Sequence, residues 1–341
     1  MIDVQNAVIA LVYNQEDGVA KGGAQDLIAV QDTTKTAESV HQALCQLGYS
    51  AVKVPVTGGL QVFAQDMSQY SPRNTFVFNI SDGLDGENSG AARVARAIED
   101  LGFAHTGATG AAVERCTDKA RAKRHLIRRG VPTPAYQVFK KPAGEVALQF
   151  PAIVKPVAED ASMGIDVESV VTNPSDLFHR VDYVVSEYRQ PALVEEFIEG
   201  REFAVSMFGN GKVECLPIVE EDFSQVENPL LHFLPYESKW IEDSYLYRNI
   251  TAQCPASLLD EDLAAVQKAA AETFRAMGLR DFGRVDVRYR DGVPYVIDIN
   301  EIPDLAPESG FPRSAGVAGY TYEAMVDRIL RLAMHREGWT P

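Results

Sequence analysis

Apolar runs alternate with amphipathic segments over about the first hundred residues, and this alternation restricts the fold more than any other feature. Ala7–Asn14 and Phe76–Ile80 are continuous apolar runs, as expected of parallel strands buried on both faces. Thr36–Gly48 and Ala91–Leu101 have helical spacing, and Tyr49–Val56 is typical of a further strand. This β-α-β pattern predicts a doubly wound α/β domain.

Ligands of doubly wound sheets bind at the carboxyl ends of strands, here the loops after Asn14 and Ile80. The first loop, Gln15–Asp32, is polar, and its Gly22-Gly23 pair lacks the spacing of a dinucleotide fingerprint, which favours a flexible surface loop. Three acidic side chains follow the second strand: Asp82, Asp85 and Glu87. They either hold a substrate amine or form ordinary Asp-Gly turns.

Composition excludes several functional classes. The 341 residues carry 32 Lys and Arg against 48 Asp and Glu, a formal charge of −16, which disfavours nucleic acid or an anionic membrane surface as partner. No apolar run reaches the ~20 residues that span a bilayer, and Asp3 stands where a signal peptide is positive, so we expect a cytoplasmic protein. Four dispersed cysteines and six dispersed histidines indicate neither a disulfide framework nor a histidine-based zinc site.

Beyond Thr117 short β-rich runs accompany one clear helix, Asp260–Met277. The runs are Ala152–Pro156, Ile165–Val171, Ala192–Phe197, Phe203–Phe208 and Lys212–Val219. Asp118–Arg129 is a basic helix, and its spacing predicts that most of its cations lie on a solvated face opposite Ala122 and Leu126.

Arg284–Tyr289 and Tyr295–Ile299 form a predicted hairpin that turns at Arg290–Gly292. Alternation of side chains puts Arg284 and Asp286 on one face of the first strand.

Asp298 and Asn300 likewise share a face of the returning strand. Two carboxylates, a carboxamide and a guanidinium can therefore converge, and such oxygen ligands suit Mg²⁺ together with substrate phosphates. A surface salt-bridge ladder is the alternative, but it is less natural on so apolar a strand.

Two further segments could bind a nucleotide. Lys155 lies on the apolar strand Phe150–Pro156, where a buried ammonium needs an anion, and the small-residue loop Glu159–Ile165 follows it. Leu193–Val205 could hold adenine and ribose at its acidic connector, or could simply be a β-turn-β unit.

In their order, these segments resemble the ATP-grasp superfamily, and most closely the D-alanine–D-alanine ligase family. The resemblance extends from about Gly107 to Val326 and rests on Thr117–Lys119, Val131–Pro134, Phe150–Pro156, Val194–Phe203, Tyr236–Trp240, Cys254–Ala256, Gly283–Asp286 and Asp298–Asn300. It implies an α/β chain with three domains. The first, 1–105, would be a doubly wound, Rossmann-like (preATP-grasp) substrate domain. The other two, 106–195 and 196–341, would form an ATP-grasp fold that clamps the nucleotide between them.

Carried over by position, the resemblance implies an ATP site. Lys119 and Lys155 would contact phosphates, Ser162 and Gly164 would belong to the phosphate-covering loop, Glu202 would bind ribose, and Glu195, Glu196, Phe197, Ile198, Phe233 and Ile297 would surround adenine. It further implies Mg²⁺, or Mn²⁺ in its place, on Asp286, Asp298 and Asn300. Arg284 would stabilise the acyl phosphate, Lys239 would reach the transferring phosphate, and Ser309 would hold the acceptor carboxylate. A homodimer is also implied.

The implied reaction is ATP-dependent joining of a carboxylate to an amine through an acyl phosphate, with ADP and phosphate as products. Two regions depart from the family: Asn79–Glu87, which includes the candidate substrate ligands Asp82 and Glu87, and Pro303-Asp304. Asp304 would recognise a cationic amine or cap its turn. We therefore expect amino-acid or small carboxylic-acid substrates other than D-alanine. The alternatives are an authentic D-alanine–D-alanine ligase of cell-wall synthesis and a non-catalytic ATP-binding protein.

Overall fold

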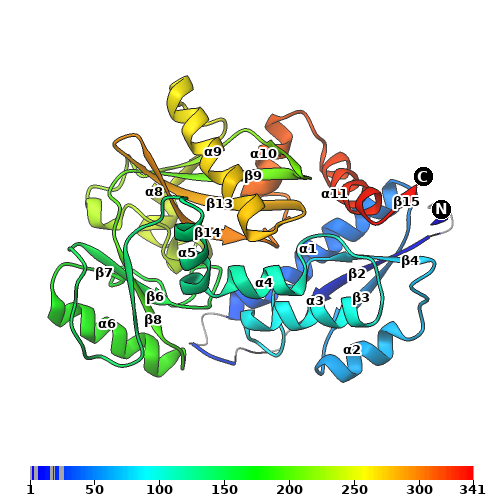
Figure 1. The fold of residues 1–341 in the computed structure, drawn as a ribbon, viewed down its shortest axis with the longest axis horizontal. Helices are drawn as coiled ribbons and strands as arrows, with labels where there is room; N and C mark the ends of the chain where they lie inside the picture. The colour runs from blue at the N-terminus through cyan, green and yellow to red at the C-terminus, as the bar shows by residue number, and fades with distance from the viewer. Residues whose placement is uncertain (1, 4–6, 16–17, 19, 23–26, 341) are drawn as a thin grey trace.

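The computed structural model describes residues 2–3, 7–15, 18, 20–22 and 27–340. Three sheets of three or more strands follow one another along the chain, and Figure 1 shows the first on the right and the second at the lower left, with the third above and between them. None of the helices in the described part of the chain combines the length and apolar character that crossing a membrane requires.

The N-terminal sheet is parallel, with the order β3-β2-β4. Its strands are β2 (Val8–Asn14), β3 (Ser50–Val56) and β4 (Thr75–Asn79). Helix α1 (Leu27–Gln46) covers one face, while α2 (Leu60–Met67) and α3 (Ala91–Asp100) cover the other. The predicted doubly wound domain is confirmed, because helices bury both faces of the three strands.

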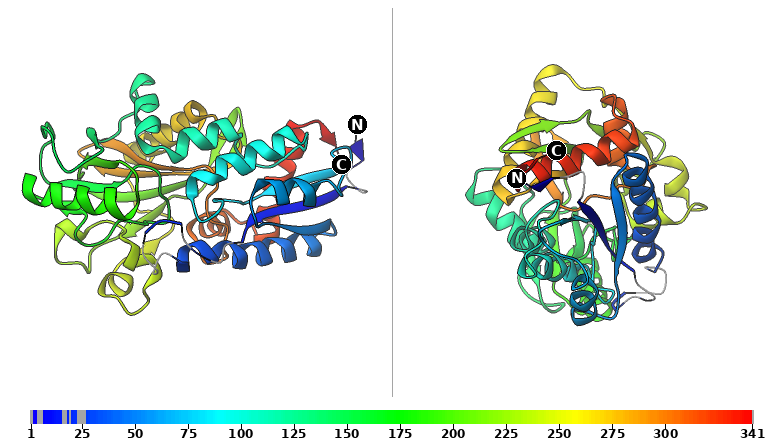
Figure 2. Two further views of the ribbon diagram at one scale, coloured as in Figure 1. Left: turned by 90° about the horizontal axis from the view of Figure 1, so that it is seen from below. Right: turned by 90° about the vertical axis from the view of Figure 1, so that its right-hand side faces the viewer.

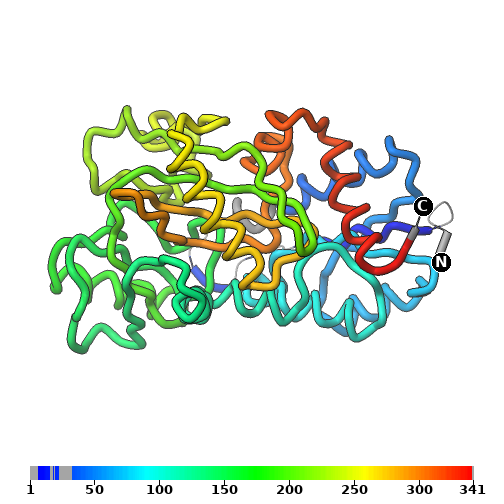
Figure 3. Tube along the Cα trace, turned by 45° about the horizontal axis from the view of Figure 1, so that its top comes forward, coloured from blue at the N-terminus to red at the C-terminus, as the bar shows by residue number. Residues whose placement is uncertain are grey.

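The last helix of the chain returns to this first sheet. α11 (Tyr322–Arg336) lies beside α1, and both contribute to one core with β2 and β4 (Figure 2). β1 (Ile2–Asp3) and β15 (Trp339–Thr340) pair in parallel next to them, so the first and last strands lie together (Figure 3). The C-terminal segment therefore stabilises the N-terminal domain.

Helix α1 begins earlier than its pattern indicated. It starts at Leu27, inside the segment expected to be a loop, although it ends before Gly48 as predicted, and Gly48 has a φ of +85°. Asp32-Thr33-Thr34 are weak helix formers, and tertiary packing of Thr33 overrides that preference. Gly23 and much of the rest of the expected loop lie outside the described residues.

The second sheet is antiparallel, with the order β5-β8-β6-β7. Its strands are β5 (Tyr136–Phe139), β6 (Ala152–Pro156), β7 (Val170–Val171) and β8 (Ala192–Glu196). The strand expected over Ile165–Val171 is limited to its last two residues. α6 (Pro174–Glu187), which the sequence analysis missed, covers one face of the sheet; Asn173 caps it, and Pro174 occupies its first turn.

The third sheet has the order β12-β11-β9-β13-β14, with β10 paired to β9. Its strands are β9 (Arg201–Asn210), β10 (Lys212–Cys215), β11 (Val219–Asp222), β12 (Thr251–Gln253), β13 (Asp281–Arg290) and β14 (Val293–Asn300). The expected Lys212–Val219 strand is thus two strands. α9 (Asp260–Met277) has its predicted bounds and packs on the sheet, and Gly278 at φ +75° ends it.

The hairpin β13–β14 is confirmed and extends beyond its predicted ends. Asp291 and Gly292 both have positive φ, +52° and +81°, as a type I′ turn requires. Arg284 pairs with Asn300, and Asp286 pairs with Asp298, so the predicted face exists in register.

Short helices connect these layers. They are α4 (Gly110–Thr117), α5 (Lys119–Arg128), α7 (Tyr236–Trp240), α8 (Tyr245–Asn249) and α10 (Gly310–Val317), with 3₁₀ turns at Asn88–Gly90 and Pro229–Leu231. α5 begins at its cap Asp118, whose carboxylate accepts from the Arg121 N–H. The domain limits 1–105, 106–195 and 196–341 stay a prediction.

Candidate active site

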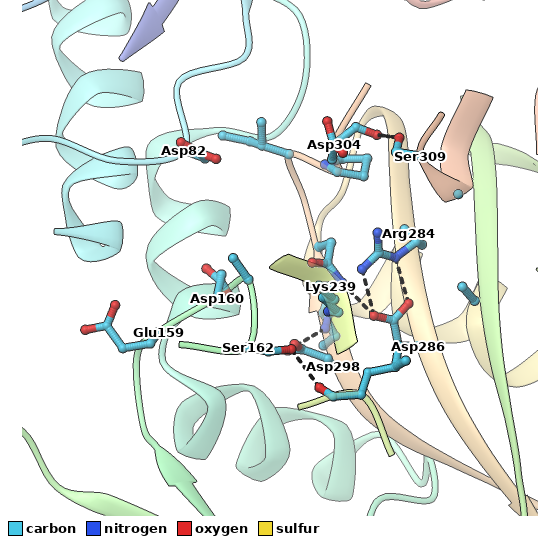
Figure 4. Close-up of a pocket in the computed structure, with 18 of the residues that line it drawn as sticks. Asp82, Glu159, Asp160, Ser162, Lys239, Arg284, Asp286, Asp298, Asp304 and Ser309 are labelled. Carbon is cyan, nitrogen blue, oxygen red and sulfur yellow. Dashed lines mark hydrogen bonds and ion pairs between the residues drawn. The ribbon is translucent and has the colours of Figure 1, made fainter. Parts of the chain in front are cut away.

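A cavity of about 620 Å³ lies where the three sheets meet. Most of the expected site residues line it: Asp82, Lys119, Lys155, Ser162, Glu202, Phe233, Lys239, Arg284, Asp286, Ile297, Asp298, Asn300, Asp304 and Ser309. Figure 4 shows the labelled side chains around a common space, with Asp82, Glu159 and Asp160 on one side and Arg284 and Asp286 on the other. Residues far apart in the chain therefore form one site.

One wall is the polar face of the β13–β14 hairpin. Arg284 donates from Nε and Nη2 to the two carboxylate oxygens of Asp286, at 2.8 and 2.9 Å. Asn300 donates to Asp286 Oδ2 at 3.1 Å. The negative charge of Asp286 raises the pKa of Arg284 above its ordinary value although desolvation opposes the charged form. The guanidinium is therefore charged and aimed into the cavity.

This wall fits a magnesium ion chemically. In the described part of the chain no three His, Cys, Asp or Glu side chains gather as a metal cluster, and the expected set has two carboxylates and one carboxamide. Mg²⁺ is usually bound by one or two carboxylates, with phosphate oxygens and water completing its shell. Asp286 and Asp298, adjacent in register and both in the cavity lining, meet that requirement.

Lys119 bridges two carboxylates at the cavity floor. Its Nζ lies 2.8 Å from Asp298 Oδ1 and 3.1 Å from Asp160 Oδ1. Although desolvation opposes ionisation, Lys119 and Lys155 lower the pKa of Asp298 to about 2. Asp298 is thus an anion at neutral pH, as a metal ligand must be.

Lys155 has the anion that its buried position requires. Glu195 lies between two ammonium groups, 3.0 Å from Lys155 Nζ and 2.9 Å from Lys123 Nζ. Most cations of this helix are exposed, as expected, and Lys119 was already expected at the phosphates, but Lys123 is an unpredicted exception because it is only 3% exposed. Lys119 and Lys123 are four residues apart, about one helical turn, and therefore lie on the same face as Leu126. This spacing is the sequence signal that indicates a buried Lys123.

A buried arginine, Arg288, holds Glu202 in the cavity wall. Arg288 Nη1 donates to Glu202 Oε2 at 2.9 Å, and its Nε donates to the Ile198 carbonyl at 2.9 Å. Phe233 lies edge-on to Phe197, whose face the Arg288 guanidinium covers. Arg288 therefore fixes the carboxylate expected to bind ribose and the aromatic ring beside the adenine position.

Glu221 is a lining residue that sequence reasoning missed. It pairs with Glu202 across β11 and β9 and therefore shares its face of the sheet. Desolvation, followed by the charge of Glu202, raises the pKa of Glu221 to about 7.

The small-residue loop over the cavity is fixed to helix α7. Ser162 Oγ donates to the Leu234 carbonyl at 2.8 Å, and Trp240 Nε1 donates to the Ala161 carbonyl at 3.0 Å. Gly164 has a φ of +74°, and a Cβ there would lie 2.5 Å from Pro156. Only glycine fits this close approach, so residue 164 must be glycine for the loop to pack against Pro156 at the end of β6.

Asp82 and Asp304 lie at the opposite end of the cavity, and both belong to regions in which the sequence departs from the family pattern. Asp304 Oδ1 accepts from the Ala306 N–H at 2.8 Å, so it caps its turn, and from Thr36 at 3.2 Å. Asp82 accepts from Thr33 at 3.2 and 3.3 Å. Removal from water, with Asp160 and Asp304 adding repulsion, raises the pKa of Asp82 to about 6.

Six of the expected residues do not line this cavity: Gly164, Glu87, Glu195, Glu196, Phe197 and Ile198. Glu87 lies 3.2 Å from Lys21, and Glu196 lies 3.0 Å from Arg290. The side chains of Glu195, Phe197 and Ile198 are buried beneath the surface. Any adenine contact from this segment would therefore come chiefly from its backbone.

Comparisons with known proteins agree with this arrangement. A family model described as the D-ala D-ala ligase C-terminus matches residues 127–331. An uncharacterised protein of Sinorhizobium fredii is 32% identical over 307 residues, which cover 89% of this chain and 88% of that protein. The D-alanine–D-alanine ligase of Pseudothermotoga lettingae is 29% identical over 300 residues, 88% of this chain and 94% of its own length.

Solved structures extend the likeness to the whole chain. The D-alanine–D-alanine ligase of Bacillus anthracis complexed with ATP has a TM-score of 0.74 at 20% identity and covers 97% of this chain and 99% of its own. The VanG D-Ala:D-Ser ligase of Enterococcus faecalis has a TM-score of 0.72 at 19% identity, with 96% and 99% covered. These likenesses confirm the expected fold, a doubly wound N-terminal domain followed by a two-domain ATP-grasp fold.

Proposed function

The chain belongs to the D-alanine–D-alanine ligase family of ATP-dependent C–N ligases, and from that premise we propose that it joins a carboxylate to an amine through an acyl phosphate. The carboxylate oxygen of the first substrate attacks the γ-phosphorus of ATP, and the bond from phosphorus to the bridging oxygen of ADP breaks. The amine then attacks the acyl carbon, loses a proton, and expels inorganic phosphate.

The cations around the cavity support this chemistry. Lys119, Lys155, Lys239 and Arg284 line the cavity. In this proposal the three lysines bind phosphate oxygens, and Arg284 neutralises charge that develops on the transferring group. Asp286, Asp298 and Asn300 would hold Mg²⁺, which supplies charge neutralisation between the phosphates when bound. The protein's own contribution is orientation and fixed charge.

One observation carries the proposal. The register of β13 and β14 places Arg284, Asp286, Asp298 and Asn300 on a single face that lines the cavity. A protein that only bound ATP would need the lysines, but it would not need a charged guanidinium beside the metal ligands. The same proposal includes that Mn²⁺ can replace Mg²⁺ and that the protein forms a homodimer.

Release of phosphate tests the function directly. Purified protein with ATP and Mg²⁺ is incubated with D- and L-amino acids, singly and in pairs, and phosphate is measured together with mass analysis of the products. We expect stoichiometric ADP, phosphate and an amide. Hydroxylamine added with a single carboxylate should give a hydroxamate, because it intercepts the acyl phosphate.

The rival functions predict other results. Strong turnover with D-alanine alone would identify an authentic D-alanine–D-alanine ligase. ATP binding with neither phosphate release nor hydroxamate from any carboxylate would contradict catalysis and favour a nucleotide-binding protein.

A further inference from the structure

Arg288 is a buried arginine to which the proposed reaction assigns no step. It lies on the same face of β13 as Arg284 and Asp286, because side chains two residues apart point to one side of a strand. The residue is 3% exposed and is not part of the cavity lining. Any effect of Arg288 on a bound nucleotide must therefore pass through the groups that it holds.

Three hydrogen bonds connect the Arg288 guanidinium to separate parts of the chain. Nη1 donates to Glu202 Oε2 at 2.9 Å and to the His232 carbonyl at 2.7 Å. Nε donates to the carbonyl of Ile198, in the connector before β9, at 2.9 Å. One side chain thus connects a lining carboxylate, the segment expected beside adenine, and the chain that follows β11.

Residues 223–240, from the end of β11 to the end of α7, are called the 223–240 segment below. The segment contains Phe233 and Lys239, and both line the cavity. Phe223 lies with its ring centre 5.8 Å from the guanidinium carbon of Arg288, and its ring stacks on that of His232. Arg288 therefore holds this segment through a ring contact and through the backbone directly before Phe233.

Glu202 depends on the charge of Arg288. Removal from water raises the pKa of Glu202, and Arg288 is the strongest charge that opposes this rise. The hydrogen bond from Arg288 occupies Oε2, whereas a carboxylate has about four acceptor positions. Glu202 can therefore accept hydroxyl groups from a molecule in the cavity while Arg288 favours its ionised form.

Stability alone does not explain this arginine. Its Nη2 is buried and has no hydrogen-bond partner in the described part of the chain. A buried donor without a partner is destabilising, and a buried ion pair is often no more stabilising than well-packed apolar side chains. The arrangement is better explained by the groups that Nη1 and Nε hold at the cavity.

We propose that Arg288 is a positioning residue through which the protein recognises the ribose of its nucleotide. It orients Glu202 toward the ribose hydroxyl groups and connects the 223–240 segment to the same carboxylate, so ribose binding and placement of the segment reinforce each other. The protein should therefore prefer ribonucleotides to deoxyribonucleotides. This inference rests on the ATP site of the proposed function and specifies which part of ATP that site recognises.

Calorimetry tests the preference without requiring turnover. ADP, 2′-deoxy-ADP and 3′-deoxy-ADP are titrated with Mg²⁺ into the intact protein. We expect at least one deoxynucleotide to bind about tenfold more weakly than ADP, because it lacks a hydrogen bond to a charged group. Equal affinity for all three nucleotides would overturn the inference and leave the ligase function intact.

Arg288→Met should reduce the preference to within about twofold, because Glu202 loses the partner that orients it. Arg201→Met is the matched control. Arg201 likewise donates to a carboxylate, that of Glu220, and covers the ring of Phe203, but neither Arg201 nor Glu220 lines the cavity. A preference that persists in Arg288→Met, or that disappears equally in Arg201→Met, would contradict the assignment.

Glu202→Gln tests whether Arg288 acts through this carboxylate. The variant should also lose the preference, and the double variant with Arg288→Met should lose no more, because both changes remove the same interaction. Additive losses would refute action through Glu202. If Arg288→Met does not fold, Arg288→Lys replaces it, since lysine keeps the charge but lacks the planar fork of donors. An unchanged preference in Arg288→Lys would then overturn the inference.

Hydrogen exchange tests the connection to the 223–240 segment. At equal saturation, ADP should slow exchange in this segment more than the weaker-binding deoxynucleotide does, and the difference should disappear in Arg288→Met. Equal protection by both nucleotides in the unmodified protein would contradict the connection. Absence of phosphate release with every carboxylate tried would defeat the ligase proposal, but it would not alter these binding results.

Discussion

At the scale of single residues, Arg284 and Asp286 hold each other in position. The bidentate pair fixes the guanidinium beside the proposed metal ligands, and Asn300 donates to the same carboxylate. Both side chains are only partly exposed, at 18% and 17%, so their charges act in a medium that screens less than water. Each of the two side chains therefore supports the role that is proposed for the other.

Arg284→Ala should lower kcat of ligation by about 10²- to 10³-fold, because it removes a fixed charge from the transferring group. ATP binding should change little, since the lysines remain. Steady-state kinetics and calorimetric ATP titration measure the two effects, with Lys268→Ala on the exposed face of α9 as control. Turnover equal to that of the unmodified protein would refute the role.

Asp286→Asn should raise the Mg²⁺ concentration for half-maximal activity by about 10- to 100-fold, because it removes one of two anionic ligands. A magnesium titration at saturating ATP measures this shift. Asp291→Asn, in the exposed turn of the same hairpin, is the matched control. A titration curve like that of the control would count against the metal site.

At the scale of elements, helix α5 has two different basic faces. Lys119 and Lys123 point inward to carboxylates of two sheets, while Arg124 and Arg128 are exposed. The inner face thus joins the second sheet to the third through charge pairs, and it does so beside the expected phosphate position.

Lys123→Met should lower the free energy of unfolding by about 3 kcal/mol, because the buried Glu195 loses one of its two counter-charges. Arg124→Met, on the solvated face of the same helix, should change it by less than about 0.5 kcal/mol. Urea unfolding of both variants measures the difference. Equal stability of the two variants would show that the inner face of α5 contributes no more to the free energy of unfolding than the outer face does.

Glu159, the first residue of the small-residue loop, should make stability depend on pH. Burial raises its pKa to about 7 from an ordinary 4.5. The folded state then binds more protons than the unfolded state between these values, so stability falls as pH rises through them, by up to about 3 kcal/mol.

Glu159→Gln should remove the loss of stability that accompanies rising pH. We expect the variant to be more stable than the unmodified protein at pH 8 and close to it at pH 5, as measured by urea unfolding at both pH values. Glu168→Gln, an exposed acid on the same segment, provides the control. A stability difference that is the same at both pH values would contradict the assigned titration.

At the scale of the whole molecule, Asp281 joins the third sheet to the segment after α3 and to the C-terminal helix α11. This fully buried carboxylate accepts from the Gly107 N–H at 2.8 Å and from Arg336 Nη2 at 2.8 Å. Arg336 also donates to the His105 carbonyl. The third sheet, the segment after α3 and helix α11 therefore meet at one ion pair.

Arg336→Met should cost about 3 kcal/mol of stability, because Asp281 would stay buried without its counter-charge. Arg331→Met removes only an exposed ion pair of the same helix and should cost less than about 1 kcal/mol. Thermal and urea unfolding compare them. A similar loss of stability in the two variants would show that the Asp281–Arg336 ion pair contributes no more to stability than an exposed ion pair does.

Periodicity predicted much of the local structure. Alternating side chains gave the β13–β14 face, the apolar runs gave the N-terminal sheet, and helical spacing gave the bounds of α9. The same kind of signal was present but missed in α11, which Thr321 caps and which carries apolar Met325 and Ile329 one turn apart. The ordered motifs indicated the family before any contact was known.

The amino-acid sequence by itself determined which side of each strand or helix is polar, because that follows from the 2- and 3.6-residue repeats. Only the tertiary structure decided which polar sides meet. It set Lys123 against Glu195 and brought Asp82 near Asp304, with α1 donating to both carboxylates. These outcomes depend on the order of strands in the sheets and on the packing of α11 against the N-terminal domain. Both features bring together residues that are far apart in the chain, and no local sequence pattern connects such residues.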